Sequence, residues 1–202
     1  IDPNQVKGIS QDSIVVKCGK NSKVVSEDDM LEYDYTTYTT YPVAVKIEQA
    51  FSSAIKSVTS DYTPVTYFVT GHGEINTNLS ELKGAIMANN YEIKELSLSN
   101  PVPEDAAVIL FVSPKTDLLP KELDNLMAFM EKGGDAIFLM DVQETDKGLP
   151  NFDTVFERYS LALNDDLVLE GDQNWYLDDF SIIIPQPNDN EVTMNLDPKS
   201  MF

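Results

Sequence analysis

The residues best suited to chemistry stand in a short motif flanked by glycines. The single histidine of the chain, His72, lies between Gly71 and Gly73, and Glu74 follows directly. An imidazole titrates near neutrality, and beside a carboxylate it can act as a general base or bind a metal ion. The motif is therefore the first candidate for a functional site.

Further polar side chains come directly after apolar runs that are typical of buried strands: Ser113, Lys115, Asp117 and Asp141. Parallel strands bring their carboxyl ends to one edge of a sheet, where the ligand crevice of such sheets lies. We therefore expect these four residues, with His72 and Glu74, to line one polar crevice. Such a crevice suits a sugar, a peptide or an anionic ligand.

Each of these residues also has a purely structural interpretation. His72 can bond a backbone group or Asp141 within a tight turn, and one histidine without a second ligand nearby is a weak metal signal. Glu74 can cap the next helix through its charge. Lys115 and Asp117 can form an ion pair within their loop, and Asp117 can also cap the helix that follows. No metal ion is expected.

A catalytic nucleophile is not expected after the apolar run at 106–112. The sequence Val112-Ser113-Pro114 lacks the glycines of a nucleophile elbow, and Pro114 has no N–H to offer an oxyanion hole. The one cysteine, Cys18, has no second cysteine with which to form a disulfide or a redox pair. We expect neither catalytic residues nor a cofactor.

The chain is strongly acidic, with 14 Lys+Arg and 34 Asp+Glu for a net charge of −20. A field of this sign repels phosphate backbones, so nucleic acid is excluded as a partner. No apolar run approaches the roughly 20 residues that span a bilayer, so the sequence predicts a soluble piece. Residues 141–202 hold 14 acidic and 3 basic residues, and 3 − 14 = −11, so this segment carries more than half of the charge.

Two features of the acidic segment carry alternatives. Its acidic residues lack the regular ligand spacing of a calcium loop, which favours a solvated surface: Asp165, Asp166, Glu170, Asp172, Asp178 and Asp179. Trp175 lies among them and suits a carbohydrate platform, a protein contact or packing over a sheet edge. The tyrosines of residues 33–41, which read as a loop, have the same ambiguity.

Alternating strand and helix patterns predict an α/β fold. Strands are expected at 65–69, 91–98, 106–112 and 136–140, with amphipathic helices at 47–58, 79–87, 119–130 and 152–159 and a last strand around Val168. Asn78 is placed as a helix cap with Glu81 as its reciprocal partner. We expect an open, doubly wound, mostly parallel sheet of flavodoxin-like or amidotransferase-like type.

The predicted domains divide at residue 60. Residues 1–60 form a partial N-terminal α+β layer with a linking helix, including short β-like runs at 13–17 and 23–25. Residues 61–202 form the α/β domain with its acidic C-terminal extension.

Four motifs occur in a characteristic order along the chain. A strand leads into Gly-His-Gly-Glu at 71–74, another into Pro-Lys-Thr-Asp at 114–117, and Phe-x-x-x-Gly-Gly at 129–134 precedes a third. Upstream lies the segment 48–55. Together they resemble the auxiliary component of gliding-motility-type ABC transport systems over about residues 44–170, and four ordered motifs are more specific than any single one.

The resemblance implies a protein that is anchored by membrane helices near its ends, helices that are absent here. This portion would lie on the extracytoplasmic face of the cell membrane beside the ABC permease and ATPase subunits, and its first residues would be the last part of a thioredoxin-like layer. A non-catalytic scaffold or binding domain is the leading hypothesis. The alternatives are a carbohydrate or peptide receptor, and a hydrolase that uses His72 with Glu74 or Asp141.

Overall fold

The structure is a computed structural model that describes residues 9, 12–33, 41–142, 148–164 and 166–185. It divides into two compact units, the first made of Ile1–Asp141 with Leu149–Val155 and the second of Val142–Gly148 with Phe156–Phe202. The domain boundary expected at residue 60 stays a prediction.

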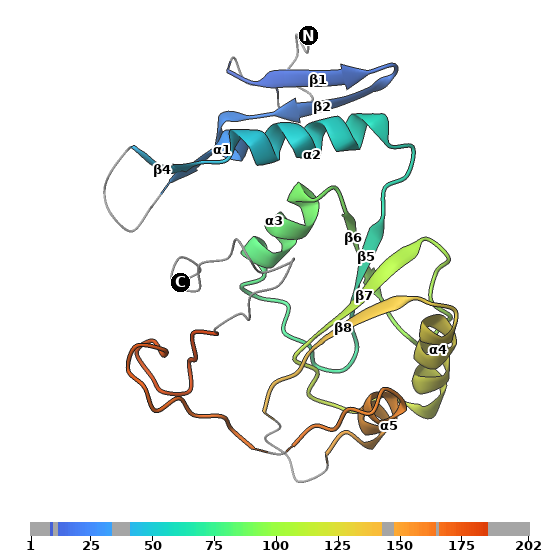
Figure 1. The fold of residues 1–202 in the computed structure, drawn as a ribbon. Helices are drawn as coiled ribbons and strands as arrows, with labels where there is room; N and C mark the ends of the chain where they lie inside the picture. Colours follow the sequence, from blue (N-terminus) through green and yellow to red (C-terminus); the bar gives the residue numbers. More distant parts are fainter. Residues whose placement is uncertain (1–8, 10–11, 34–40, 143–147, 165, 186–202) are drawn as a thin grey trace. The chain divides into compact units, whose positions relative to one another are not determined.

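The centre of the first unit is a four-stranded parallel sheet (Figure 1). Its strands are β5 (Val65–Val69), β6 (Glu92–Leu96), β7 (Ala106–Val112) and β8 (Asp135–Leu139), in the order β6-β5-β7-β8. The expected parallel α/β sheet is thus confirmed, because each strand predicted between residues 65 and 140 forms one of its strands.

Helices cover both faces of this sheet (Figure 1). The chain passes from β5 to β6 through α3 (Ser80–Ala88) and from β7 to β8 through α4 (Pro120–Glu131), and α5 (Pro150–Arg158) follows β8. The two crossovers run in opposite directions along the sheet. Because such crossovers are right-handed, α3 and α4 lie on opposite faces.

The strands alternate their side chains between two apolar layers. On one face, Phe68, Leu110 and Val112 pack against Leu79 and Leu82 next to and within α3. On the other face, the ring of Phe111 stacks on Phe138 at a centroid distance of 4.9 Å and meets Phe152 of α5 edge-on at 5.3 Å. Burial on both faces explains why β5 and β7 are almost wholly apolar.

Strand β8 forms one edge of the sheet. Ile137 and Leu139 pair in register with Leu110 and Val112 and therefore point to the same face. They are nevertheless 49% and 44% exposed.

The N-terminal part of the first unit mixes short strands and helices. β1 (Ile14–Cys18) and β2 (Asn21–Val25) form an antiparallel hairpin that packs on α2 (Ile47–Thr59). Between β2 and α2 the chain forms α1 (Glu27–Met30), β3 (Leu31–Tyr33) and β4 (Pro42–Val45). Strands β3 and β4 pair with each other in antiparallel orientation. The Asn90 side chain donates to the Ser53 carbonyl at 2.9 Å, which ties α2 to the segment after α3.

Two local predictions are wrong. Val168 is not in a strand: Leu167, Val168 and Leu169 are all more than half exposed, and this short apolar run has no strand beside it within the described residues. The only bridge that the structure describes in the second unit pairs Tyr176 with Ile183.

The predicted cap of α3 is the second error. Asn78 adopts a left-handed backbone conformation with φ 58°, and the N-cap is Leu79, which makes no side-chain bond. Residues 34–40 of the tyrosine-rich stretch and Asp165 lie outside the described residues.

A buried histidine clamp and an adjoining pocket

The loop after β5 folds tightly against the loop after β7. Gly71 and Gly73 have φ of 121° and 76°, a conformation that side chains disfavour. The His72 carbonyl accepts the backbone N–H groups of Lys115 at 2.7 Å and Thr116 at 3.0 Å. A Cβ on Gly73 would lie 3.2 Å from that of Lys115, so the close approach also favours glycine here.

The imidazole of His72 is enclosed between two carboxylates. Its Nδ1 lies 2.9 Å from Glu74 Oε1 and its Nε2 lies 3.0 Å from Glu122 Oε2, while only 3% of the residue is exposed. Carboxylates accept hydrogen bonds, so protonated His72 can donate from both nitrogens. We call Glu74, His72 and Glu122 the histidine clamp.

Backbone and hydroxyl groups support the two carboxylates of the clamp. Glu74 Oε2 accepts the His72 backbone N–H at 2.8 Å, and Glu122 Oε2 accepts the Leu119 N–H at 2.8 Å. The Ser99 hydroxyl donates to Glu122 Oε1 at 3.4 Å. The clamp thereby joins the β5 loop, the connection between β6 and β7, and the start of α4.

The electrostatics of the clamp favour its charged form. The hydrogen bond with Glu74 raises the pKa of His72 above its ordinary 6.5, with a further contribution from Glu122, although burial acts in the opposite direction. Burial alone would raise the pKa of both carboxyls, but the bonds from His72 and from backbone N–H groups lower each below 4.5. The two carboxylates therefore favour the protonated ring more than water would.

The sequence predicted part of this arrangement. His72 bonds Glu74, one of its expected partners, but its second partner is Glu122 and not Asp141. Glu74 does not cap α3, because both of its oxygens bond His72. Glu122 was missed: it stands at the third position of α4, where a glutamate reads as an ordinary capping residue.

Ser113 and Lys115 converge on Asp141. Ser113 has φ of 52°, and its buried hydroxyl donates to Asp141 Oδ2 at 3.1 Å. Lys115 Nζ donates to the same oxygen at 3.0 Å. The expected ion pair between Lys115 and Asp117 is wrong, since Lys115 reaches across to the residue that follows β8.

Asp117 caps a helix, though not the expected one. Its carboxylate accepts the backbone N–H of Asn151 at 3.1 and 3.0 Å and that of Phe152 at 3.2 Å, which places it at the start of α5. The start of α4 is instead satisfied by Glu122. Asp117 is thus a structural residue that holds α5 against the loop after β7.

Trp175 lies in the second unit, where its backbone N–H donates to Asp172 at 2.9 Å and its carbonyl accepts the Ile184 N–H at 2.7 Å. Within the described residues, no three His, Cys, Asp or Glu side chains come together in a way that could hold a metal ion.

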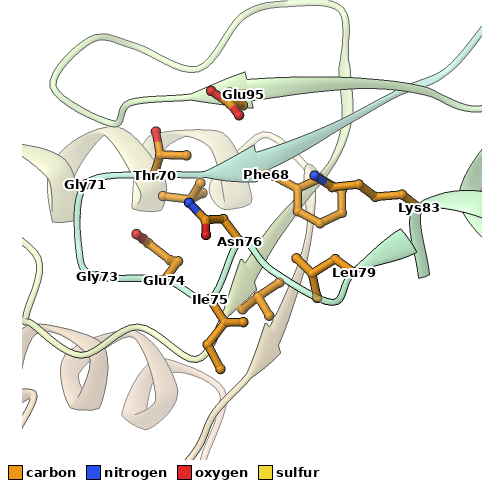
Figure 2. A pocket seen from close by; sticks show the side chains of 12 residues that line it. Phe68, Thr70, Gly71, Gly73, Glu74, Ile75, Asn76, Leu79, Lys83 and Glu95 are labelled. Atoms are coloured by element: carbon orange, nitrogen blue, oxygen red, sulfur yellow. The ribbon is translucent and has the colours of Figure 1, made fainter. Parts of the chain in front are cut away.

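A pocket of about 240 Å³ opens beside the β5 loop on the α3 face (Figure 2). Of the site residues that the sequence predicts, Glu74 lines this pocket. The other lining residues come from β5 and its loop, α3 and the segment before it, β6 and β7: Phe68, Val69, Thr70, Gly71, Gly73, Ile75, Asn76, Leu79, Lys83, Glu95 and Val112.

None of the helices in the described part of the chain has the length and apolar character that crossing a membrane requires.

Comparison with known proteins finds a family and similar solved structures. No curated protein matches the chain. One similar solved structure is "mmIFT52 N-terminal domain", with 18% sequence identity and a TM-score of 0.48. The match covers 57% of this chain and 53% of that chain, so this chain spans about half the length of the solved one. A family model described as "ABC-type uncharacterized transport system" matches residues 63–178, more than half of the chain. The chain belongs to this family of auxiliary components of ABC-type transport systems.

Proposed function

We propose that this protein is a non-catalytic accessory domain of an ABC-type transport system that acts at the extracytoplasmic face of the membrane by binding a permease or ATPase-associated subunit. The observation that carries the non-catalytic part is the histidine clamp. Both imidazole nitrogens of His72 are engaged by carboxylates and the ring is buried.

The clamp argues against the hydrolase alternative. A general base needs a free nitrogen within hydrogen-bond reach of the substrate proton, and both ring nitrogens of the buried His72 face carboxylates. Ser113 already donates its hydroxyl to Asp141, and Pro114 follows it without an N–H. These groups stabilise the loops and offer no nucleophile.

The finer parts of the proposal follow from the sequence motifs. The ordered motifs support a gliding-motility-type system, with membrane helices outside this chain that anchor the domain. The four-stranded sheet and the N-terminal hairpin with α2 are compatible with the flavodoxin-like sheet and the thioredoxin-like layer that this type implies.

Co-purification tests the accessory role. The full-length protein is affinity-purified from gently solubilised native membranes, and the bound proteins are identified by mass spectrometry. We expect the permease and ATPase of one ABC system to be enriched over an unrelated anchored protein that carries the same tag. Recovery without any ABC subunit would contradict the role.

Labelling of Cys18 tests the location. Cys18 is the single cysteine of the chain and is exposed. In intact cells that express the full-length protein, a membrane-impermeant maleimide should label the peptide that contains Cys18, and Cys18→Ser should remove the label from that peptide. Labelling that requires lysis of the cells would contradict an extracytoplasmic location.

The pocket favours a second candidate, an extracytoplasmic receptor for a carbohydrate or peptide. A concave site of about 240 Å³ beyond the carboxyl end of a parallel strand is the usual ligand position in such sheets. The receptor role is compatible with docking to a permease, because the pocket occupies one limited part of the surface.

A further inference from the structure

We propose that the pocket beside β5 binds a small zwitterion, an amino acid with an apolar side chain, whose carboxylate is held by Lys83 and whose ammonium group is held by Glu95. This inference rests on the receptor role of the pocket and assigns it a free amino acid in place of a carbohydrate or peptide. It does not depend on docking to ABC subunits.

The position of the pocket supports ligand binding. Four secondary elements or their connections contribute to it, and it lies where the sheet order reverses: β6 and β7 are neighbours of β5 on opposite sides. At such a switch point the connections leave the sheet in opposite directions and open a crevice between them. The glycines of the β5 loop add no side chains that would close it.

Two residues of opposite charge line the pocket beside the buried ring of Phe68. Lys83 Nζ lies over the ring of Phe68, 5.3 Å from its centroid, as Figure 2 also shows. Glu95 is the register partner of Phe68 on the neighbouring strand β6. Within the described residues, no ion pair joins Lys83 to Glu95, and neither charged group has a hydrogen-bond partner.

The floor of the pocket is apolar and its walls are polar. Phe68 and Val112, both more than nine-tenths buried, and Leu79 form the floor. Asn76 and Thr70 add an amide and a hydroxyl beside them (Figure 2). An aliphatic side chain can therefore cover the floor while the polar end of the ligand meets the charged groups.

The charge pattern selects a dipolar ligand. A simple anion that bound Lys83 would also face Glu95, and a simple cation that bound Glu95 would also face Lys83. A neutral polyol would desolvate both charges without matching either. An α-amino acid carries both complementary groups on the same carbon atom.

The histidine clamp defines which lining carboxylate is available. Glu74 also lines the pocket, but both of its oxygens accept hydrogen bonds from His72. Glu95 has no such partner among the described residues and is exposed to solvent. The ammonium group is therefore assigned to Glu95.

Calorimetric titration of the 202-residue chain tests the assignment, with the common free L-amino acids as probes. We expect saturable binding of aliphatic members such as L-leucine. N-acetyl-L-leucine lacks the ammonium group and L-leucinamide lacks the carboxylate, so each should bind about tenfold more weakly or worse. D-glucose serves as the neutral polyol and should not bind.

Two variants locate the site, and two control for general effects of charge. Lys83→Met and Glu95→Gln should each weaken L-leucine binding by about tenfold or more. Lys121→Met and Glu104→Gln alter exposed residues outside the pocket and should leave the affinity unchanged. Thermal unfolding of each variant shows whether it is folded before it is titrated.

Several results would overturn the inference: no saturable binding by any of the amino acids, equal binding of the N-acetyl or amide derivative, or binding that folded Lys83→Met and Glu95→Gln retain. Preferential binding of D-glucose would also overturn it and would favour a carbohydrate receptor. If the chain binds no amino acid but the full-length protein still co-purifies with ABC subunits, the zwitterion site is wrong and the accessory role stands.

Discussion

His72 connects three segments that lie far apart in the sequence. Its own loop follows β5, Glu122 lies in the first turn of α4, and Ser99 approaches Glu122 from the connection between β6 and β7. Removing one member of a buried ionic group leaves the others without a partner, which costs more than the intact group contributes. The clamp should therefore govern the stability of the carboxyl edge of the sheet.

The titration of His72 can be followed directly, because the chain has one histidine. We expect the NMR signals of its imidazole to titrate with a pKa above 6.5, since Glu74 and Glu122 both stabilise the protonated ring. Glu74→Gln should lower this pKa, whereas Glu104→Gln should not change it. A pKa at or below 6.5 would contradict the charged clamp.

The sign of each shift sets the pH range in which the clamp stabilises the fold. The contribution of His72 is fully present below pH 6.5 and is lost as the pH rises through its higher folded pKa. The contributions of Glu74 and Glu122 are present above pH 4.5 and are lost as the pH falls through their lower folded pKa values. The clamp therefore contributes most to the free energy of unfolding between pH 4.5 and pH 6.5.

Replacing His72 by alanine should destabilise the protein severely. Two buried carboxylates would lose their shared cation, and we expect the free energy of unfolding to fall by about 3–5 kcal/mol in urea denaturation at pH 6. Glu122→Gln leaves one ion pair in place and should cost less. A loss below about 1 kcal/mol in His72→Ala would mean that the clamp is solvated.

At the scale of elements, α5 depends on a residue from a distant loop. Asp117 accepts hydrogen bonds from two backbone N–H groups at the start of α5. The Asn151 side chain donates to the Leu118 carbonyl at 2.7 Å. Phe152, one residue further, packs edge-on against Phe111. The cap therefore positions an aromatic side chain of the core.

Asp117→Ala should reduce the free energy of unfolding by about 1 kcal/mol, because the first N–H groups of α5 lose their acceptor. Amide hydrogen exchange at Asn151 and Phe152 should become faster, while exchange in α3 stays unchanged. Asp117→Asn keeps a capping oxygen and should retain most of the stability. Equal exchange rates in the alanine variant and the unmodified protein would contradict the cap.

The elements were predictable where local pattern decides the structure. The run at 106–112 is apolar throughout and forms β7. The helix expected at 119–130 is α4, which begins at Pro120 and ends two residues before Gly133, residue types that are common at the start and end of a helix. The run at 167–169 looks similar, but a strand also needs a neighbour with which to pair, and none lies beside it among the described residues. Pairing partners depend on tertiary structure.

The site was predictable only in part for the same reason. The pairing of His72 with Glu74 spans two residues and follows from the motif itself. Glu122 lies 50 residues further along the chain, and Asp117 bonds residues more than 30 positions away. No periodicity or spacing encodes such contacts, and Lys83 and Glu95 read as ordinary surface charges until the sheet places them beside Phe68.

At the scale of the whole molecule, charge decides which surfaces the domain avoids. The net charge of −20 gives it a field that repels anionic lipid headgroups and nucleic acid alike. An accessory domain held beside a membrane would then stay off the lipid surface and meet its partner subunits. Basic partners would be attracted in a salt-dependent manner.

Vesicle sedimentation tests this repulsion. The chain should stay in the supernatant with vesicles of phosphatidylcholine and phosphatidylserine at low salt, and equally with phosphatidylcholine alone. A cationic lipid added to the vesicles should bring it into the pellet, and about 0.15 M salt should weaken that binding by screening. Sedimentation with the anionic vesicles would contradict the prediction.

The exposed edge strand β8 has a consequence for how the purified protein behaves in concentrated solution. Within the described sheet β8 is an edge strand, and with the half-exposed side chains of Ile137 and Leu139 it is a template on which a second chain can add by edge-to-edge pairing. Mutual repulsion between highly charged copies opposes that encounter at neutral pH. Near the isoelectric point of about 4.1 the repulsion vanishes, so we expect edge-to-edge pairing through β8 to be most favoured there.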